Sequence, residues 1–108
     1  MDLTRKRCVP CESGMKPMTR TEALKHLKSV QGWRLSGKSI YLETKFKDFR
    51  QAMRFIVGVG RIAEAENHHP DICLYSWNRV RLTLSTHAIG GLSVNDFIVA
   101  AKINRLRG

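Results

Sequence analysis

The stretch from Asp48 to Pro70 constrains the fold of this chain more than any other. Asp48 and Gln51 have the spacing of a capping box, which starts a helix, and Pro70 cannot continue one. Between them the pattern predicts the longest helix, ending at about Asn67. Its apolar residues form two adjacent stripes: Phe49, Ala52, Met53, Ile56, Gly60 and Ala63, then Phe55, Val59 and Ile62. Such a wide arc exceeds what one sheet face covers, so we expect part of it to pack against another subunit.

The segments on both sides of this helix have the pattern of paired strands. Residues 39–46 alternate between apolar and polar side chains, as a half-buried antiparallel strand does, and residues 33–35 predict a short strand before it. Beyond the helix, residues 72–77 and 80–87 predict a second pair of strands. In the last of these, one face carries Arg81, Thr83, Ser85 and His87.

Capping boxes at Thr19 and at Ser93 indicate two further helices. The first should extend to about Val30 and the second to about Leu106. The resulting order is α-β-β-α-β-β-α. Hairpins separated by a helix predict an α+β fold, in which helices pack on one face of a four-stranded antiparallel sheet.

The length of 108 residues fits one domain, and an apolar fraction of 43% permits a packed core. We expect residues 1–18 to form an irregular N-terminal arm and residues 19–108 to form the domain. No apolar run approaches the roughly 20 residues of a membrane span. No apolar segment of a secretory signal follows the charged first residues, so the expected location is the cytoplasm.

The net charge of +10, from 19 Lys and Arg against 9 Asp and Glu, invites a nucleic-acid interpretation. The distribution of the basic residues argues against it, because only residues 5–7 form a dense cluster. Aromatic residues are not interleaved with basic ones as in single-strand or RNA-binding modules. We therefore expect a basic, solvated surface, with nucleic acid as an improbable partner.

The three cysteines are Cys8, Cys11 and Cys73, and they do not suggest a disulfide framework. Cys8 and Cys11 have the spacing of half a zinc knuckle or of a redox pair. A knuckle needs a second pair, and redox pairs open a helix after a strand. The favoured interpretation is that they have no chemical role, and the alternative is an intersubunit or adventitious metal site.

The residues suited to chemistry gather in the second half of the chain. His68 and His69 are adjacent, and His87 could reach the same pocket from the end of a strand. Histidine exchanges protons near neutral pH. If the helix persists to His68, Glu64 lies four residues before it and can pair with it. Asp96, in the first turn of the last helix, could orient a histidine through a hydrogen bond.

Three interpretations of this cluster stay open on residue types alone. As an acid and a base, histidines suit a reaction that expels hydroxide from carbon and removes a proton from nitrogen. Alternatively, Glu64 and the histidines ligate a metal, although the spacing of a zinc-binding HExxH helix is absent. A surface role is plausible for one histidine, and we assign it to His26, but it is less plausible for three near one predicted pocket.

These residues resemble the pterin-4a-carbinolamine dehydratase family. The resemblance covers roughly residues 19–104 and leaves out the arm with Cys8 and Cys11. It rests on these stretches: Gly32-Trp33, Phe46-Lys47-Asp48-Phe49, Glu64-x-x-x-His68-His69-Pro70, Tyr75-Ser76-Trp77-Asn78, Leu84-Ser85-Thr86-His87, Gly91-Leu92-Ser93 and Asp96. It implies an α+β fold with a four-stranded antiparallel sheet, assembled as a homodimer or homotetramer.

The resemblance implies a carbon–oxygen lyase of tetrahydrobiopterin metabolism. The reaction would be dehydration of 4a-hydroxytetrahydropterin to quinonoid dihydropterin, without metal or organic cofactor, in support of an aromatic amino acid hydroxylase. His68, His69 and His87 would be the acid–base groups, and which is acid and which is base stays open. The residues implied to bind the pterin or support the histidines are Glu64, Asn67, Ser85, Thr86, Asp96 and Trp33.

Other members of the family point to a different function. Animal members also act as dimerisation cofactors of a homeodomain transcription factor, and plant relatives assist the assembly of a carbon-fixing enzyme. The alternative is therefore a non-catalytic protein-binding module on the same fold. Such a module would use the wide apolar arc of the helix that follows Asp48.

Overall fold

The computed structural model describes residues 2–10 and 15–107. Expectations about Cys11 lie outside the described residues. The elements in chain order are η1 (Leu3–Arg5), α1 (Arg20–Leu27), β1 (Arg34–Ser36), β2 (Ser39–Lys45), α2 (Phe49–Glu66), β3 (Asp71–Tyr75), β4 (Arg79–Leu84), η2 (His87–Ile89) and α3 (Val94–Arg107), where η marks a short 3-10 helix.

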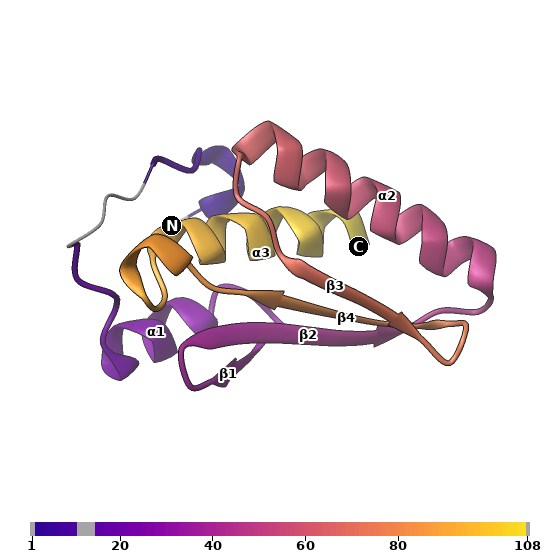
Figure 1. The fold of residues 1–108 in the computed structure, drawn as a ribbon, viewed down its shortest axis with the longest axis horizontal. Coiled ribbons are helices and arrows are strands. Elements are labelled where there is room, and N and C mark those ends of the chain that lie inside the picture. The colour runs from indigo at the N-terminus through magenta and orange to yellow at the C-terminus, as the bar shows by residue number, and fades with distance from the viewer. Residues whose placement is uncertain (1, 11–14, 108) are drawn as a thin grey trace.

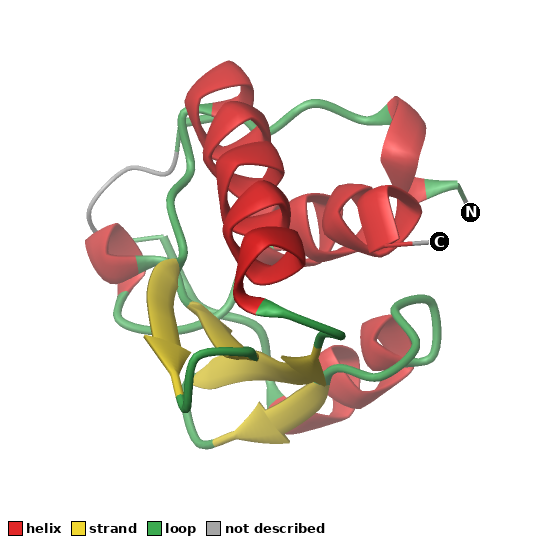
Figure 2. Cartoon of the chain, turned by 90° about the vertical axis from the view of Figure 1, so that its right-hand side faces the viewer, coloured by secondary structure: helices red, strands yellow, loops and turns green. Residues whose placement is uncertain are grey.

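The four strands form one antiparallel sheet in the order β1-β2-β4-β3. Helices α2 and α3 lie on one face of this sheet, and α1 lies near β1 (Figure 1). Seen from the end of the molecule, α2 and α3 pack together on the same side of the strands (Figure 2). The predicted α+β fold and the order α-β-β-α-β-β-α are confirmed.

The core lies between the sheet and these two helices. Strands β2 and β4 alternate as predicted and turn one apolar face inward. The buried side chains of this layer are Ile40, Leu42, Val80, Leu82 and Leu84 from the strands, and Ala52, Phe55, Val59, Phe97, Ile98 and Ile103 from the helices. On the outer face, Arg81 forms an exposed ion pair with Glu43 and stacks over the Tyr41 ring.

Two predicted ends of strands are wrong. The strand expected over residues 72–77 ends at Tyr75, because Ser76 and Trp77 adopt left-handed conformations (φ +49° and +57°) in the turn to β4. The strand expected over residues 80–87 ends at Leu84. The ladder of backbone pairs in the sheet ends at these two residues.

The first helix is also shorter than predicted. Its capping box is present, with Thr19 and Glu22 each accepting a hydrogen bond from the other's backbone N–H. The helix ends at Leu27 instead of Val30, and the chain then turns through Gly32 at φ +86°. The turn leaves Val30 buried in the core without helical geometry, so its apolar character misled the prediction of the helix end.

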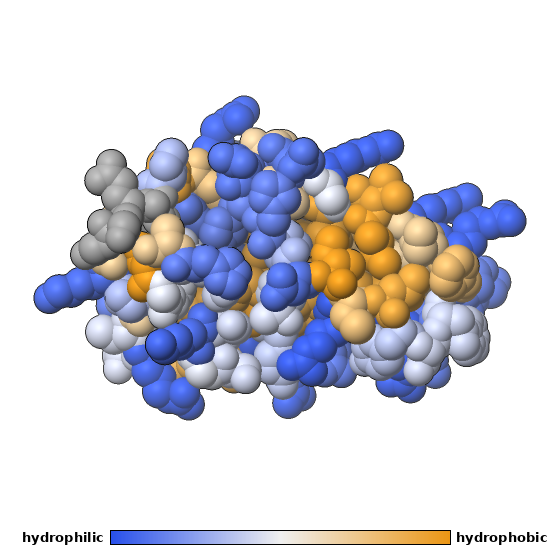
Figure 3. All heavy atoms as spheres, in the orientation of Figure 1, coloured by the Kyte–Doolittle hydropathy of each residue, from blue (hydrophilic) through white to orange (hydrophobic). Residues whose placement is uncertain are grey.

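One flank of α2 has no covering element in the described chain. Figure 3 shows an apolar patch over the region where α2 lies beside β3. The exposed large apolar side chains of these two elements are Phe49, Met53, Val57 and Ile72, which we call the α2 patch. No helix among residues 2–10 and 15–107 is long and apolar enough to cross a membrane.

Candidate active site

A cavity of about 330 Å³ opens at the end of the molecule where α2 ends and α3 begins. This volume lies at the lower end of the range for small-molecule sites, about 300–1,000 Å³. The wall is formed by Cys8, Val9, Pro10, Glu66, Asn67, His68, His69, Ser85, Thr86, His87, Ala88 and Asn95. The cavity therefore brings together the N-terminal arm, the end of α2, the segment after β4 and the start of α3.

The end of α2 determines where the two adjacent histidines lie. Asn67 adopts a left-handed conformation (φ 51°, ψ 42°), which ends the helix. The next backbone N–H, of His68, returns to the carbonyl of Ala63 at 3.1 Å. His68 thus follows a reversal of the chain, and the expected helical pairing of Glu64 with His68 does not form.

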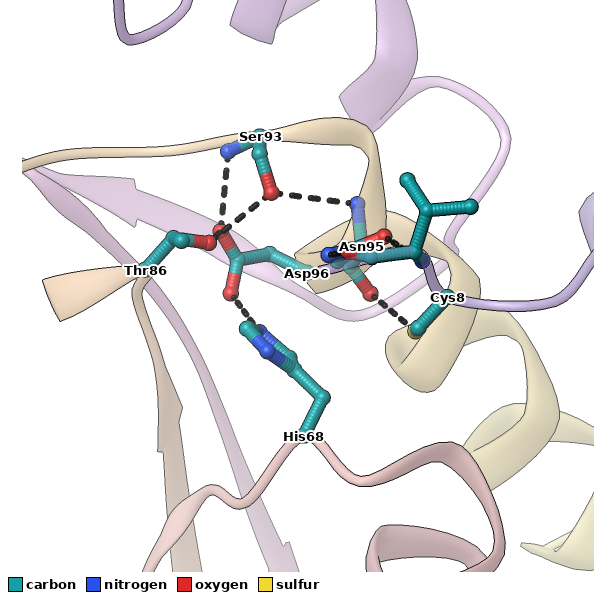
Figure 4. A network of polar contacts seen from close by, with 7 residues as sticks. Cys8, His68, Thr86, Ser93, Asn95 and Asp96 are labelled. Carbon is teal, nitrogen blue, oxygen red and sulfur yellow. Dashed lines mark hydrogen bonds and ion pairs between the residues drawn. The ribbon is translucent and has the colours of Figure 1, made fainter. Parts of the chain in front are cut away.

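His68 instead pairs with Asp96 of α3. The distance from His68 Nε2 to Asp96 Oδ1 is 2.7 Å, and the Asp96 side chain is 0% exposed. The other carboxylate oxygen accepts hydrogen bonds from Thr86 Oγ1 at 2.8 Å and from the Ser93 N–H at 3.0 Å (Figure 4). This is the carboxylate–imidazole contact that Asp96 was expected to offer, and it fixes the orientation of the ring.

Hydroxyl groups complete the surroundings of Asp96. Because the Thr86 hydroxyl donates to Asp96, its contact with Ser93 Oγ at 2.8 Å must be donated by the serine. Ser93 Oγ in turn accepts the backbone N–H of Asn95 at 3.2 Å. Asp96 therefore has two functions, since the carboxylate that orients His68 also accepts a hydrogen bond at the start of α3.

His69 forms a second pair on the outer side of the cavity. Its Nε2 lies 2.5 Å from Glu64 Oε2, in the last turn of α2. The side chains are 54% and 79% exposed, whereas the His68 side chain is 13% exposed. Each of the two adjacent histidines therefore contacts a carboxylate. The His68–Asp96 pair is largely buried, whereas the His69–Glu64 pair is exposed to solvent.

His87 reaches the cavity from a different element than predicted. It is the first residue of η2 and not the end of a strand. The chain leaves the sheet after Leu84, and Thr86 then pairs with Gly91 in an isolated bridge. This bridge holds the η2 loop against the pocket, so that Ser85, Thr86 and His87 line it in succession.

Most of the predicted site residues meet in this cavity. His68, His69, His87, Asn67, Ser85 and Thr86 line it, and Glu64 and Asp96 contact two of the histidines.

The expected place of Trp33 is wrong. Its ring is buried in the core and donates Nε1–H to Asn104 Oδ1 at 2.9 Å. Asn104 lies eight residues beyond Asp96 on α3, about 12 Å along the helix axis. The aromatic character of Trp33 therefore serves packing at the opposite end of α3.

The arm supplies wall residues that the sequence did not indicate. Cys8 N–H donates to Glu66 Oε1 at 2.8 Å, and Glu66 Oε2 accepts from Lys102 Nζ at 2.6 Å. Val9 exchanges two hydrogen bonds with the Asn95 side chain, at 3.0 and 2.6 Å. These contacts join positions 36 to 86 residues apart, so no local pattern could reveal them.

The environment of Cys8 explains why its thiol is unsuited to nucleophilic chemistry. Burial, together with the nearby Glu66 charge, raises the pKa of Cys8 to about 12, so the group is a neutral thiol at pH 7. The thiol is within 3.5 Å of the Asn95 carbonyl oxygen, to which it donates. Within residues 2–10 and 15–107, no group of three or more His, Cys, Asp or Glu side chains is arranged to hold a metal ion.

Comparison with known proteins identifies relatives over almost the whole chain. The family model described as pterin 4 alpha carbinolamine dehydratase matches residues 16–106. A protein of Nitrosospira multiformis, named provisionally as a pterin-4-alpha-carbinolamine dehydratase, is 45% identical over 105 residues. The match spans 97% of this chain and 92% of that protein.

Solved structures share the fold. A crystal structure described as a transcriptional coactivator/pterin dehydratase from Brucella Melitensis is 34% identical, with a TM-score of 0.79, over 86% of this chain and 100% of that one. A pterin dehydratase-like protein, described as a RuBisCO assembly factor in the alpha-carboxysome, is 22% identical, with a TM-score of 0.62. It covers 74% of this chain and 94% of that one, and at this identity the likeness concerns the fold alone.

Proposed function

The chain belongs to the pterin 4 alpha carbinolamine dehydratase family, and from this premise we propose that it dehydrates a 4a-hydroxytetrahydropterin by histidine acid–base catalysis. The observation that carries the proposal is one cavity lined by three histidines, of which one is fixed by a buried carboxylate. The physiological setting that follows is recycling of tetrahydrobiopterin for an aromatic amino acid hydroxylase, in the cytoplasm.

The reaction breaks one carbon–oxygen bond and one nitrogen–hydrogen bond. The hydroxyl at C4a leaves as water after it receives a proton, and N5 loses its proton as the quinonoid dihydropterin forms. Atoms and charge balance without a further reactant, so the protein needs one proton donor and one proton acceptor. Imidazoles suit both tasks at neutral pH.

His68 is the better placed base. Because Asp96 accepts hydrogen bonds through both oxygens, His68 Nε2 carries the hydrogen that it donates, which leaves Nδ1 as the acceptor. When Nδ1 takes a proton, the imidazolium forms next to a buried carboxylate that stabilises its charge. The acid is then His69 or His87, which both line the cavity and are exposed to solvent.

The direct test is stopped-flow loss of 4a-hydroxytetrahydropterin absorbance with and without the protein. We expect acceleration that survives a chelator and falls by roughly 10² in His69→Ala, the usual scale for an acid–base group. His26→Ala is the matched control, because His26 lies on α1 and is absent from the cavity wall. Full activity of His69→Ala would remove His69 from the mechanism and leave His87 as the acid.

A second proposal concerns self-association through the α2 patch. Phe49, Met53 and Val57 project from one flank of α2 and are 40–52% exposed, beside Ile72 at the open edge of the sheet. Contiguous exposed apolar side chains mark protein contacts. A homodimer or homotetramer that buries the α2 patch would cover the part of the helix's apolar arc that the sheet leaves exposed.

The same patch is what a non-catalytic binding module would offer to another protein. Light scattering after size exclusion separates the two uses. A closed oligomer in the wild type and a monomer in Met53→Glu support self-association. A wild-type monomer would leave the patch free and favour the binding module. Leu24→Glu is the matched control, since Leu24 is equally exposed but lies on α1.

A further inference from the structure

Cys8 and Val9 of the N-terminal arm are hydrogen-bonded to residues in the wall of the candidate active site. Val9 is held on both its N–H and its C=O by the side-chain amide of Asn95, as a neighbouring strand would hold it. Cys8 is held through its N–H by Glu66, whose position Lys102 fixes. The side chains that grip the arm are largely buried: Asn95 is 3% exposed, and the Glu66 side chain is 6% exposed.

Further contacts fix the arm on both sides of this point. On one side, Leu3 of η1 is buried in the core next to α3. On the other side, Met18 N–H donates to the Leu92 carbonyl at 2.8 Å. Pro17 also packs on Gly91, where an added Cβ would lie 2.6 Å from the Cβ of Pro17. The described parts of the arm, residues 2–10 and 15–18, lie at the end of the molecule where α2 ends and α3 begins (Figure 1).

The arm presents an apolar surface to the cavity. Cys8, Val9 and Pro10 line it together with the three histidines. The two hydrogen bonds with Asn95 are made by the backbone of Val9. Val9 is 58% exposed. A ligand in the cavity would cover it.

We infer that the arm segment 8–10 is a wall of the substrate site, against which Val9 and Pro10 pack the bound pterin. The inference rests on the proposed function and deepens it. Asn95 acts through the arm and is a positioning residue. It is also the neighbour of Asp96, so the first turn of α3 holds both the apolar wall and the catalytic imidazole (Figure 4).

Direct binding tests this wall independently of turnover. The probes are two stable 7,8-dihydropterins, one with a methyl group and one with a dihydroxypropyl group at C6, titrated calorimetrically. In Val9→Ala we expect Kd to rise about three- to tenfold, because two buried methyl groups are lost. Val9→Trp narrows the cavity, so it should raise Kd more for the larger dihydroxypropyl ligand than for the methyl one. Leu24→Ala on α1 is the control for loss of an exposed aliphatic side chain.

Kinetics distinguish a wall from a merely structural segment. In Val9→Ala we expect KM to rise with Kd and kcat to stay within twofold, since the histidines are untouched. Asn95→Ala should raise KM and also speed tryptic cleavage at residues 5–7. Asn95→Asp keeps the acceptor for Val9 N–H, so the rises in KM and in cleavage rate should be smaller. Bound dihydropterin should slow that cleavage in the wild type.

The outcomes separate the inference from the function on which it rests. Wild-type binding without dehydration would overturn the proposed function, while the Kd values of the Val9 variants still decide on the wall. Unchanged Kd and KM in both Val9 variants, with an active wild type, would overturn the wall alone. If neither dihydropterin binds an active wild type, the wall is overturned and the proposed function stands; if the wild type neither binds them nor dehydrates the carbinolamine, both proposals fail.

Discussion

His68 and His69 are neighbours in the chain, and each contacts a carboxylate, yet the two pairs differ in nearly every physical respect. The His68–Asp96 pair is almost fully enclosed, and its carboxylate accepts from Thr86 and Ser93 as well. The His69–Glu64 pair is exposed on both sides. Attraction between exposed charges is screened by water, whereas a buried polar group depends on its partners. The comparison teaches that the distance between a histidine and its carboxylate does not by itself indicate how much the contact contributes to stability.

Replacement of Asp96 should have the largest effect. In Asp96→Asn, the enclosed imidazole loses its charge partner, and the amide NH2 must face either the Thr86 and Ser93 donors or the N–H of His68. We expect a loss of about 3 kcal/mol in unfolding free energy and a fall in kcat of roughly 10²–10⁴. Urea denaturation and stopped-flow turnover measure the two. A variant as stable as the wild type would show that burial does not strengthen this pair.

Thr86→Val tests the hydrogen bond that Thr86 donates to the carboxylate of the buried His68–Asp96 pair. The valine keeps the shape of the threonine but removes the hydroxyl that donates to Asp96 Oδ2 at 2.8 Å. The buried oxygen then keeps only the Ser93 N–H, so we expect a loss of about 2 kcal/mol in unfolding free energy. Urea denaturation measures it, with the half-buried Thr83 on the outer sheet face as a Thr→Val control. Equal stability of Thr86→Val and wild type would contradict the dependence on partners.

The stability that Glu66 contributes by holding the N-terminal arm should depend on pH. Burial alone would raise the pKa of Glu66, but the hydrogen bonds from Lys102 and from the Cys8 N–H together hold it below 4.5. A carboxyl with a lowered pKa stabilises the folded state above its unfolded pKa, and the contribution disappears as pH falls through the folded value. In Glu66→Gln we expect a loss of about 1.5 kcal/mol at pH 7.

Denaturation of wild type and Glu66→Gln at several pH values checks this expectation. The two curves should differ most at neutral pH and converge as the pH falls below about 4.5, the ordinary value for this carboxyl. A constant difference from pH 7 to pH 3 would mean that the glutamate acts by shape and not by charge.

The exposed pair should respond least. In Glu64→Gln we expect a change of less than about 0.5 kcal/mol in unfolding free energy, because both side chains are solvated. Any effect on KM should shrink at high salt, where exposed charges are screened. Turnover at low and high ionic strength, beside Asp96→Asn, measures the contrast. A loss as large as that of Asp96→Asn would remove the distinction between the pairs.

Much of the fold followed from local patterns. The alternation in β2, the length of α2 and the Thr19 capping box are properties of neighbouring residues, and the structure confirms them. The histidines could also be grouped from their positions in the sequence, since His68 and His69 adjoin a helix end and His87 lies three residues beyond the last strand.

What failed depended on single backbone conformations or on distant contacts. The left-handed Asn67 ends α2 one residue before His68, so the helical pairing of Glu64 with His68 does not form. The left-handed Ser76 and Trp77 shorten β3 in the same manner. The wall formed by the arm depends on Asn95 and Glu66, which meet it only in the folded chain.

The double use of Asp96 has a consequence for judging other chains by their sequences. The same carboxylate that orients the imidazole accepts the Ser93 N–H and the Thr86 hydroxyl, so a descendant that abandoned the reaction would still keep it to hold its last helix. An aspartate in this position therefore reports a preserved architecture, not a working enzyme. In the proposed mechanism the better markers of activity are His69 and His87, which are exposed and line the cavity.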